Sequence, residues 1–185
     1  MGEGTLKGRL LVAAPGMGDP NFDGTVVFML DHTDDGAVGV VLNRPSETAV
    51  RDALPGWADV AAPPPMFYVG GPVVPAGAIA LGRATDGGEP DGWSTVLGRA
   101  GLVPIGEADD GPGAGIDAVR LFAGHAGWIS GQLEAEVEAG GWIVLDADPG
   151  DAFTPDPAGL RRAVLARQRG RLAWFANCPP DPRVN

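Results

Sequence analysis

Short apolar segments separated by glycine and proline are the feature that most constrains this chain. It has 30 glycines and 18 prolines in 185 residues, and these end apolar runs such as Thr25–Leu30, Ala37–Leu42 and Met66–Val69. A β-branched or aromatic run of about four to eight residues between turn residues is typical of a buried strand. Because 44% of the residues are apolar, such strands can fill a core. The sequence therefore predicts a folded, loop-rich chain of many short strands, not a disordered one.

Three short helices are predicted between these strands. Each begins at a residue that favours helix starts and carries apolar residues on one face. The predicted starts are Ser46, Ser130 and the pair Asp156-Pro157. The glycines and the serine of residues 124–130 predict a turn after a strand at Ala118–Ala123, and residues 172–175 predict one more short strand. We expect one domain over residues 1–185, with its core at 6–175 and a frayed tail at 176–185.

Charge and cysteine content limit the possible partners and the compartment. The chain has 13 basic and 24 acidic residues, a net charge of −11, which disfavours direct nucleic-acid binding. The one basic cluster comprises Arg161, Arg162, Arg167, Arg169 and Arg171. A single cysteine, Cys178, excludes an internal disulfide. Since no signal peptide or long apolar span is evident, we expect a cytosolic protein that does not enter a membrane.

Four sequence strings, taken in order, resemble a bacterial protein family. They are LLVAAPGMGDPNFDGTVVFMLDH (10–32), GAVGVVLNRP (36–45), VGGPV (69–73) and GHAGWISGQLEAE (124–136). Together they resemble the AlgH/YqgE family, over roughly residues 6–175. The chain departs from the family at His125, where a tyrosine is usual, and at Ser130, where members vary. Neither residue can then carry chemistry that defines the family.

The resemblance implies an α/β (α+β) fold: a single domain whose complex, bent, mixed β-sheet of short strands is flanked by about three helices. It implies no activity. Members of the family are mostly described as being of unknown function, and some are labelled transcriptional regulators without an evident DNA-binding motif.

The residue types of a hydrolase or a metal site are present, but not in the spacing that such sites use. Ser130, with Asp31 and either His32 or His125, has the composition of a catalytic triad, yet its surroundings do not match the G-x-S-x-G elbow. Asp31 and His32 with His125 and Glu134 could hold a metal, but no H-E-x-x-H or paired-cysteine spacing occurs. A helix cap at Ser130 and a hydrogen-bonded turn at His32 explain these residues better than a nucleophile or a metal ligand does. We therefore predict no catalytic residue, no metal and no cofactor.

One set of polar and glycine residues predicts a ligand pocket. Its members lie where apolar strands end or where a helix begins, which are the places where α/β folds bind ligands. They are Asn43, Arg44, Gly70, Gly71, Trp128 and Gln132. Arg44 supplies a planar fork for an anion. The alternative is that Arg44 is structural and pairs with Asp19 or Glu134.

These observations favour a non-enzymatic binding or regulatory protein that recognises a small ligand or a protein partner. The alternative is a hydrolase-like enzyme with a pocket around Asn43 and Arg44 and with His32 as acid or base. A DNA-binding regulator is a weaker third option, because it requires a surface stripe of arginines that only the last helix could supply.

Overall fold

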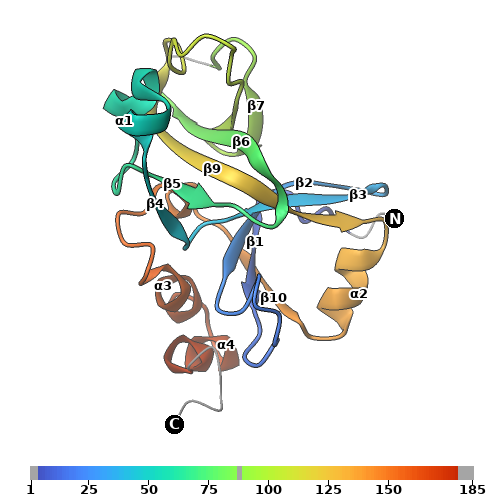
Figure 1. Ribbon diagram of the computed structural model, residues 1–185. Coiled ribbons are helices and arrows are strands. Elements are labelled where there is room, and N and C mark those ends of the chain that lie inside the picture. Colours follow the sequence, from blue (N-terminus) through green and yellow to red (C-terminus); the bar gives the residue numbers. More distant parts are fainter. Residues whose placement is uncertain (1–3, 87–88, 179–185) are drawn as a thin grey trace.

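The computed structural model describes residues 4–86 and 89–178. Most of the tail predicted at residues 176–185 lies outside this part of the chain. The described residues form a strongly curled sheet with helices around it, an α+β architecture in which strands dominate (Figure 1). The expectation of a bent sheet in a single domain is confirmed.

Ten strands form one sheet in the described part of the chain. The strands are β1 (Arg9–Ala13), β2 (Val26–Thr33), β3 (Gly36–Val41), β4 (Pro45–Ala49), β5 (Met66–Val69), β6 (Val73–Ala84), β7 (Ser94–Leu97), β8 (Ala100–Val103), β9 (Ile116–Ile129) and β10 (Trp142–Asp146). Their order in the sheet is β10-β1-β2-β3-β9-β6-β8-β7, and β4 joins through β5, which pairs with β9. The strand pairs are antiparallel except β5 with β9. The predicted mixed sheet therefore has only this one parallel strand pair.

Two strands are much longer than the short strands that we predicted. β9 has 14 residues and β6 has 12. The predicted turn at residues 124–130 is wrong, because β9 runs through to Ile129 and pairs with β3 along this stretch. Gly124 adopts a φ of 70°, a left-handed conformation that glycine tolerates because it has no side chain. The pairing of β6 with β9 slips between Val73 and Ala78, across from Gly124. Glycine thus bends this strand instead of ending it.

The helices are more numerous than the three predicted, and none of the three predicted starts is the N-cap of a helix. They comprise α1 (Val50–Ala53), α2 (Gln132–Glu138), α3 (Leu160–Ala166), α4 (Arg171–Trp174) and the 3₁₀ turns η1 (Pro55–Val60), η2 (Asp151–Phe153) and η3 (Phe175–Asn177). Ser46 lies inside strand β4. Gly131, not Ser130, is the N-cap of α2, and no side chain caps that helix. Gly159 is the N-cap of α3, and Asp156 accepts a hydrogen bond from the Gly159 N–H in the turn before that helix. The strand predicted at residues 172–175 is mostly helix α4, so that prediction is also wrong.

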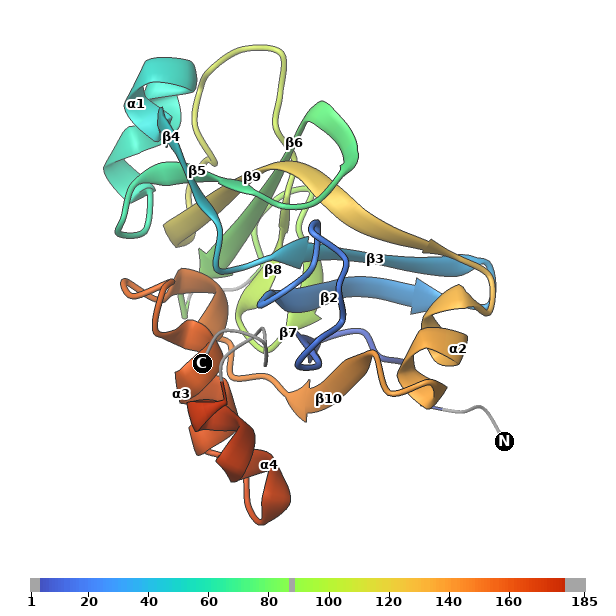
Figure 2. The same ribbon diagram turned by 60° about the horizontal axis from the view of Figure 1, so that its bottom comes forward.

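Strand β1 is buried on both faces, which explains its continuous apolar sequence. Leu10 and Val12 face one core cluster, to which α3 contributes Leu160 and Val164. Leu11 and Ala13 face a second cluster, to which α2 contributes Leu133. Figures 1 and 2 place α2 and the α3–α4 pair on opposite sides of β1 and β10. A third cluster packs η1 against β6 and β9.

Candidate functional site

Asn43 and Arg44, the first two predicted pocket residues, hold the connection between β1 and β2. The Asn43 side chain accepts a hydrogen bond from the Val26 N–H (2.9 Å) and donates one to the Gly24 carbonyl (3.0 Å). The Arg44 guanidinium donates to the carbonyl oxygens of Pro20 (3.3 Å), Asn21 (2.5 Å) and Asp23 (3.0 Å). Arg44 is therefore structural, but its partners are carbonyl groups and not the carboxylates of Asp19 or Glu134 that we predicted as the alternative.

Gly70 and Gly71 allow the end of β5 to pass very close to β9. A Cβ atom at Gly70 would collide with the Gly124 carbonyl, and one at Gly71 would collide with the backbone of His125. The Gly70 N–H donates to the Ala123 carbonyl, and its carbonyl accepts from the Val41 N–H. The backbone of Gly70 is thus committed to the sheet. Close packing accounts for both glycines.

Trp128 and Gln132 belong to a hydrogen-bonded network centred on the Glu136 carboxylate. One carboxylate oxygen accepts from the indole N–H of Trp128 and from that of Trp142, each at 2.9 Å. The other oxygen accepts from the Gln132 amide at 2.9 Å. Burial alone would raise the pKa of Glu136, but these hydrogen bonds lower it below its ordinary value. Phe22 stacks on Trp128 and meets Trp142 edge to face, so the aromatic rings fill the space beside the carboxylate.

His32 is held between a backbone donor and a carboxylate. Its Nδ1 accepts from the Leu6 N–H (3.0 Å), and its Nε2 lies 2.7 Å from the Glu134 carboxylate. Because Nδ1 is an acceptor, the proton is on Nε2 and is donated to Glu134. The pKa of Glu134 is lowered, first by its own backbone N–H and then by His32. This arrangement uses both nitrogens of His32 in structural contacts.

The predicted pocket residues fall into two groups at opposite ends of β3. Ala37 lies beside Trp128 and His32 in the sheet, whereas Asn43 follows six residues later, about 20 Å along an extended chain. The hydrolase-like alternative requires His32 to lie close to Arg44, but the structure places the two residues at opposite ends of β3. The connection between β1 and β2 spans the two groups, since Arg44 binds its carbonyls and Phe22 packs on Trp128.

Ser130 and His125, the other candidates for catalysis, are not adjacent to an activating group. The Ser130 hydroxyl donates to the Asp34 carbonyl (2.6 Å) and so fixes the turn between β2 and β3. His125 lies five residues earlier on β9, opposite Val73. Of the four residues considered for a metal, only His32 and Glu134 meet. Within residues 4–86 and 89–178, no three His, Cys, Asp or Glu side chains gather in a way that could hold a metal ion.

The first half of β6 exposes a continuous apolar strip. Five consecutive residues, Pro72 to Ala76, are exposed, and Val69 and Ala78 extend the exposed surface on either side. The exposed fractions of Val69 and Val74 are 45% and 59%. We call residues 69, 72–76 and 78 the β6 strip. No charged residue occurs between Val69 and Gly82.

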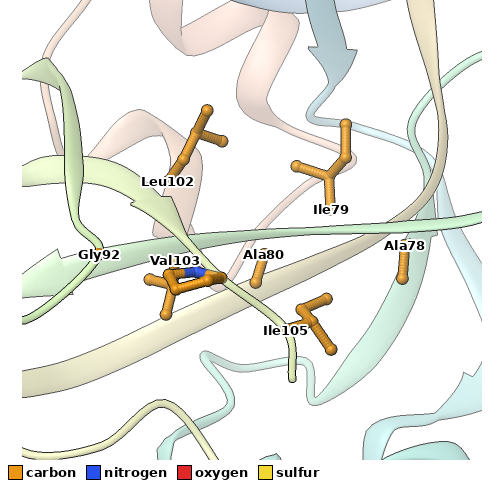
Figure 3. A pocket seen from close by; sticks show the side chains of 8 residues that line it. Ala78, Ile79, Ala80, Gly92, Leu102, Val103 and Ile105 are labelled. Atoms are coloured by element: carbon orange, nitrogen blue, oxygen red, sulfur yellow. The ribbon is translucent and has the colours of Figure 1, made fainter. Parts of the chain in front are cut away.

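A cavity of about 360 Å³ adjoins this strip. β8 pairs with β6 only from Ala80 to Arg83, and the cavity lies where β8 ends and the chain continues to Ile105. Its lining is apolar: Figure 3 shows Ile79 and Leu102 together with Val103 and Ile105 around it. A second cavity, of about 180 Å³ and with a polar lining, lies next to the Arg83–Asp117 ion pair, and a third, of about 260 Å³, lies beside Trp93. None of the three is lined by a residue of the predicted pocket.

Arg120 is a buried residue whose role the sequence analysis missed. It is 2% exposed, and its guanidinium lies 4.3 Å from the centre of the Tyr68 ring. All its N–H groups donate to carbonyl oxygens, those of Ala62, Pro63, Pro64, Ala152 and Thr154, at 2.9–3.3 Å. The signal in the sequence was an arginine inside an apolar strand, where a charge is tolerated only if it is fully bonded.

Comparisons with known proteins agree with the four sequence strings. The sequence profile of a family described as AlgH-like matches residues 10–173. The chain is 46% identical to a UPF0301 protein of Streptomyces avermitilis, covering 98% of this chain and 96% of the relative, and 44% identical, with the same coverage, to one of Thermobifida fusca.

Two solved structures resemble this fold. Protein DIP2367 of Corynebacterium diphtheriae gives a TM-score of 0.85 at 31% identity, covering 95% of this chain and 93% of the other. The solution structure of the AlgH protein of Pseudomonas aeruginosa gives 0.70 at 30% identity, covering 96% of each chain.

Proposed function

This chain belongs to the AlgH-like family, and on that premise we propose that it is a non-enzymatic protein that binds a protein partner through the β6 strip. The names of its relatives state no reaction. The residues that could have formed a hydrolytic site are separated or serve as hydrogen-bonded supports. We further propose that the protein acts in the cytosol, which its single cysteine supports. None of the described helices has the length and apolar character needed to span a bilayer.

The exposed apolar strip is the observation that carries this proposal. Runs of three or more consecutive exposed apolar residues are avoided in soluble proteins unless they serve a function. Here five such residues follow one another, and they sit next to an apolar cavity. Within the residues described, no strand pairs with Val73, Ala78 or Ile79 on the edge of β6 that faces away from β9, and residues 74–77 bulge out of the pairing with β9. Such an edge can accept an extended segment of another chain.

Backbone strain at Val74 marks the same place. Its φ is 45°, the only positive value for a residue other than glycine among those described. A β-branched side chain rarely adopts this conformation, which costs about 1–3 kcal/mol. A glycine at position 74 would remove the strain, whereas a valine keeps an apolar side chain 59% exposed. Contact with a protein partner is a reason for a valine at this position.

The occupant that we propose is a basic protein that presents an extended apolar segment. The strip itself carries no charge, so contact there depends on apolar side chains and backbone hydrogen bonds. The whole chain carries a net charge of −11, which attracts a basic partner over a distance and repels a second copy. Pro75 has no N–H, so the partner segment pairs with only part of the edge.

Direct binding to DNA receives little support from the arginine cluster at residues 161–171. Arg161 is buried, and Arg167 forms a two-pronged ion pair with Asp151 at 2.7 and 2.5 Å. Arg162, Arg169 and Arg171 remain exposed. Three arginines on a strongly acidic protein make a poor phosphate-binding surface.

Site-specific crosslinking tests the proposal. A photoreactive amino acid replaces Val74 in one variant and the exposed Ala139, the C-cap of α2, in a control variant, and crosslinked products are identified in cells. We expect the first variant alone to yield a recurrent product with a basic protein. A product with a second copy of the chain, or the same products from both variants, would show that the proposed occupant is wrong.

A binding measurement with the purified partner completes the test. Val74→Asp places a charge on the strip, and we expect an affinity at least about tenfold weaker. The free energy of unfolding should not fall, since the side chain is exposed and aspartate tolerates a positive φ better than valine does. Equal affinities for the variant and the wild type would remove the strip from the interface.

A further inference from the structure

The apolar cavity beside the β6 strip forms where β8 stops pairing with β6. The last residue pair of these strands is Ala80 with Val103. Pro104 comes next in the chain and would oppose Ile79 if the pairing continued, but a proline has no N–H to donate. The pairing therefore ends here, and the apolar side chains where the two strands part line a cavity of about 360 Å³ (Figure 3).

The edge of β6 at this cavity keeps backbone groups for a further strand. In the described part of the chain, no strand pairs with Ala78 or Ile79 on the side away from β9. Successive residues of a strand direct their N–H and C=O groups to alternate edges, so one of these two residues directs them to the open edge. A segment that adds to β6 here passes beside the cavity, and its side chains on one face can enter it.

The lining of the cavity selects an apolar side chain. It includes no charged, hydroxyl or amide side chain, and its largest members are Ile79, Leu102 and Ile105. A polar group placed there would find no side-chain partner, which costs free energy, whereas burial of an apolar group is favourable. A volume of about 360 Å³ lies at the lower end of the range for small-molecule sites, so it suits a single large side chain better than a cofactor.

Asp91 brings one carboxylate next to this lining. It directly precedes Gly92, a lining residue that packs so closely on Pro104 that a Cβ atom would lie 2.8 Å from the proline ring. The Trp93 N–H donates to the Pro90 carbonyl (3.1 Å), which fixes the turn that contains Asp91 and Gly92. Asp91 is exposed and forms no ion pair with a described residue. Its negative charge therefore stays available beside the cavity.

Glu107 brings a second carboxylate close to the same lining. It follows Ile105 by two residues and is exposed. Among the residues that the structure describes, it too has no partner in an ion pair. The only basic residue between Asp91 and Glu107 in the sequence is Arg99, which pairs with Asp86. The chain next to the cavity thus carries negative charge around an uncharged lining.

We propose that the partner segment places one large apolar side chain, of the size of leucine or phenylalanine, in this cavity and carries a lysine or an arginine beside it. The lining selects the apolar side chain, and the carboxylates of Asp91 and Glu107 select the basic one. An acidic residue in its place is repelled, so the site discriminates between segments of equal hydrophobicity. This inference rests on the proposed function and deepens it, since it names the chemistry by which the surface around the β6 strip recognises its partner.

Titration of the intact protein with a small aromatic amine tests the cavity directly. Phenethylamine carries a ring and an ammonium group, phenethyl alcohol keeps the ring without the charge, and phenylacetate reverses the charge. The methyl NMR signals of Ile79, Leu102, Val103 and Ile105 report on occupation. We expect the amine to shift these signals saturably, the alcohol to bind at least about twofold more weakly, and phenylacetate at least about fivefold more weakly. No shift with the amine, or an equal affinity for phenylacetate, would overturn the proposal.

Matched variants test the lining and the carboxylates separately. Ile105→Ala removes part of the lining, and we expect it to weaken the binding of all three compounds. Asp91→Asn combined with Glu107→Gln should remove the advantage of the amine and leave the affinity for the alcohol unchanged. Asp110→Asn, which changes another exposed carboxylate of the same loop, is the control and should alter neither affinity. An amine preference that survives the double variant would show that the two carboxylates play no part.

Failure of this inference differs from failure of the proposed function. A recurrent crosslink of Val74 to a basic protein, without methyl shifts on titration, overturns the inference and leaves the β6 strip as the interface. Methyl shifts without such a crosslink overturn the proposed function, and with it the occupant assigned to the cavity. Circular dichroism confirms that each variant is folded, and the wild-type titration decides the outcome if one is not.

Discussion

Arg120 and Arg161 are both buried arginines, but their surroundings differ in one decisive respect. Arg120 lies 2% exposed in β9, and five carbonyl oxygens accept all of its N–H groups. Arg161 lies 8% exposed in α3, and only one of its three nitrogens has a partner in the described chain. Burial lowers the pKa of both side chains.

The difference distinguishes an arginine that holds the fold together from one that has donors without partners. The bonds of Arg120 reach the segments at residues 62–64 and 152–154, so this side chain ties two loops to the sheet. A group whose bonding capacity is used in this way has nothing left for a ligand. Arg161 retains two donors that the protein itself does not satisfy. Full bonding indicates a structural role, whereas buried donors without a partner in the described chain are an energetic cost.

The largest effect is expected at Arg120. Arg120→Met keeps much of the volume but takes a donor from five carbonyl groups, two of which belong to the buried residues Ala62 and Ala152, and a buried carbonyl without a donor costs free energy. The removal of a buried cation offsets part of that cost. We expect the free energy of unfolding to fall by at least about 3 kcal/mol, measured by urea denaturation. Arg83→Met, which removes a partly exposed ion pair with Asp117, should cost no more than about 1 kcal/mol. Equal losses for the two variants would contradict the support role of Arg120.

A smaller loss is expected at Glu136, the second fully bonded group. Glu136→Ala leaves two indole N–H groups and the Gln132 amide without their acceptor. We expect a loss of about 2 kcal/mol in the same measurement. Glu138→Ala on the same helix is the control, since Glu138 is exposed and we expect little change. A control variant as unstable as Glu136→Ala would show that helix composition, not the network, is responsible.

The same carboxylate makes part of the stability depend on pH. The pKa of Glu136 is lower in the folded state than in the unfolded chain, where it is about 4.3. Its contribution is therefore fully present above that pH and is lost as the pH falls through the folded value. We expect the wild type to lose stability more steeply below about pH 4.3 than Glu136→Gln, which has no carboxylate to titrate. Parallel pH profiles of stability for the two proteins would show that the network does not depend on the charge.

The sequence predicted the strands of the core better than their lengths. Continuous β-branched and aromatic runs between turn residues identified β2, β3 and β5, because a strand that is covered on both faces carries apolar residues without alternation. The turn at residues 124–130 was wrong because a glycine inside a strand and a glycine in a turn look alike in sequence. The partner strand decides between them, and β3 lies far away in the chain.

The candidate site was harder to predict, for a related reason. Polar residues at strand ends were selected because ligands bind there, but Asn43, Arg44 and Gln132 found protein partners instead. Those partners come from distant segments and cannot be identified from spacing. Arg161 was assigned only to a basic cluster, although its inward position next to Leu160 and Val164 places it at the core. Which arginine stays unbonded depends on three-dimensional contacts alone.

The smallest change in stability is expected at Arg161, and its size distinguishes Arg161 from Arg120. Arg161→Met removes one hydrogen bond to Cys178 but also two buried donors without partners. The loss and the gain are of similar size, so we expect the free energy of unfolding to change by less than about 1 kcal/mol. A loss as large as that of Arg120→Met would mean that Arg161 is a support after all, and the contrast between the two arginines would fail.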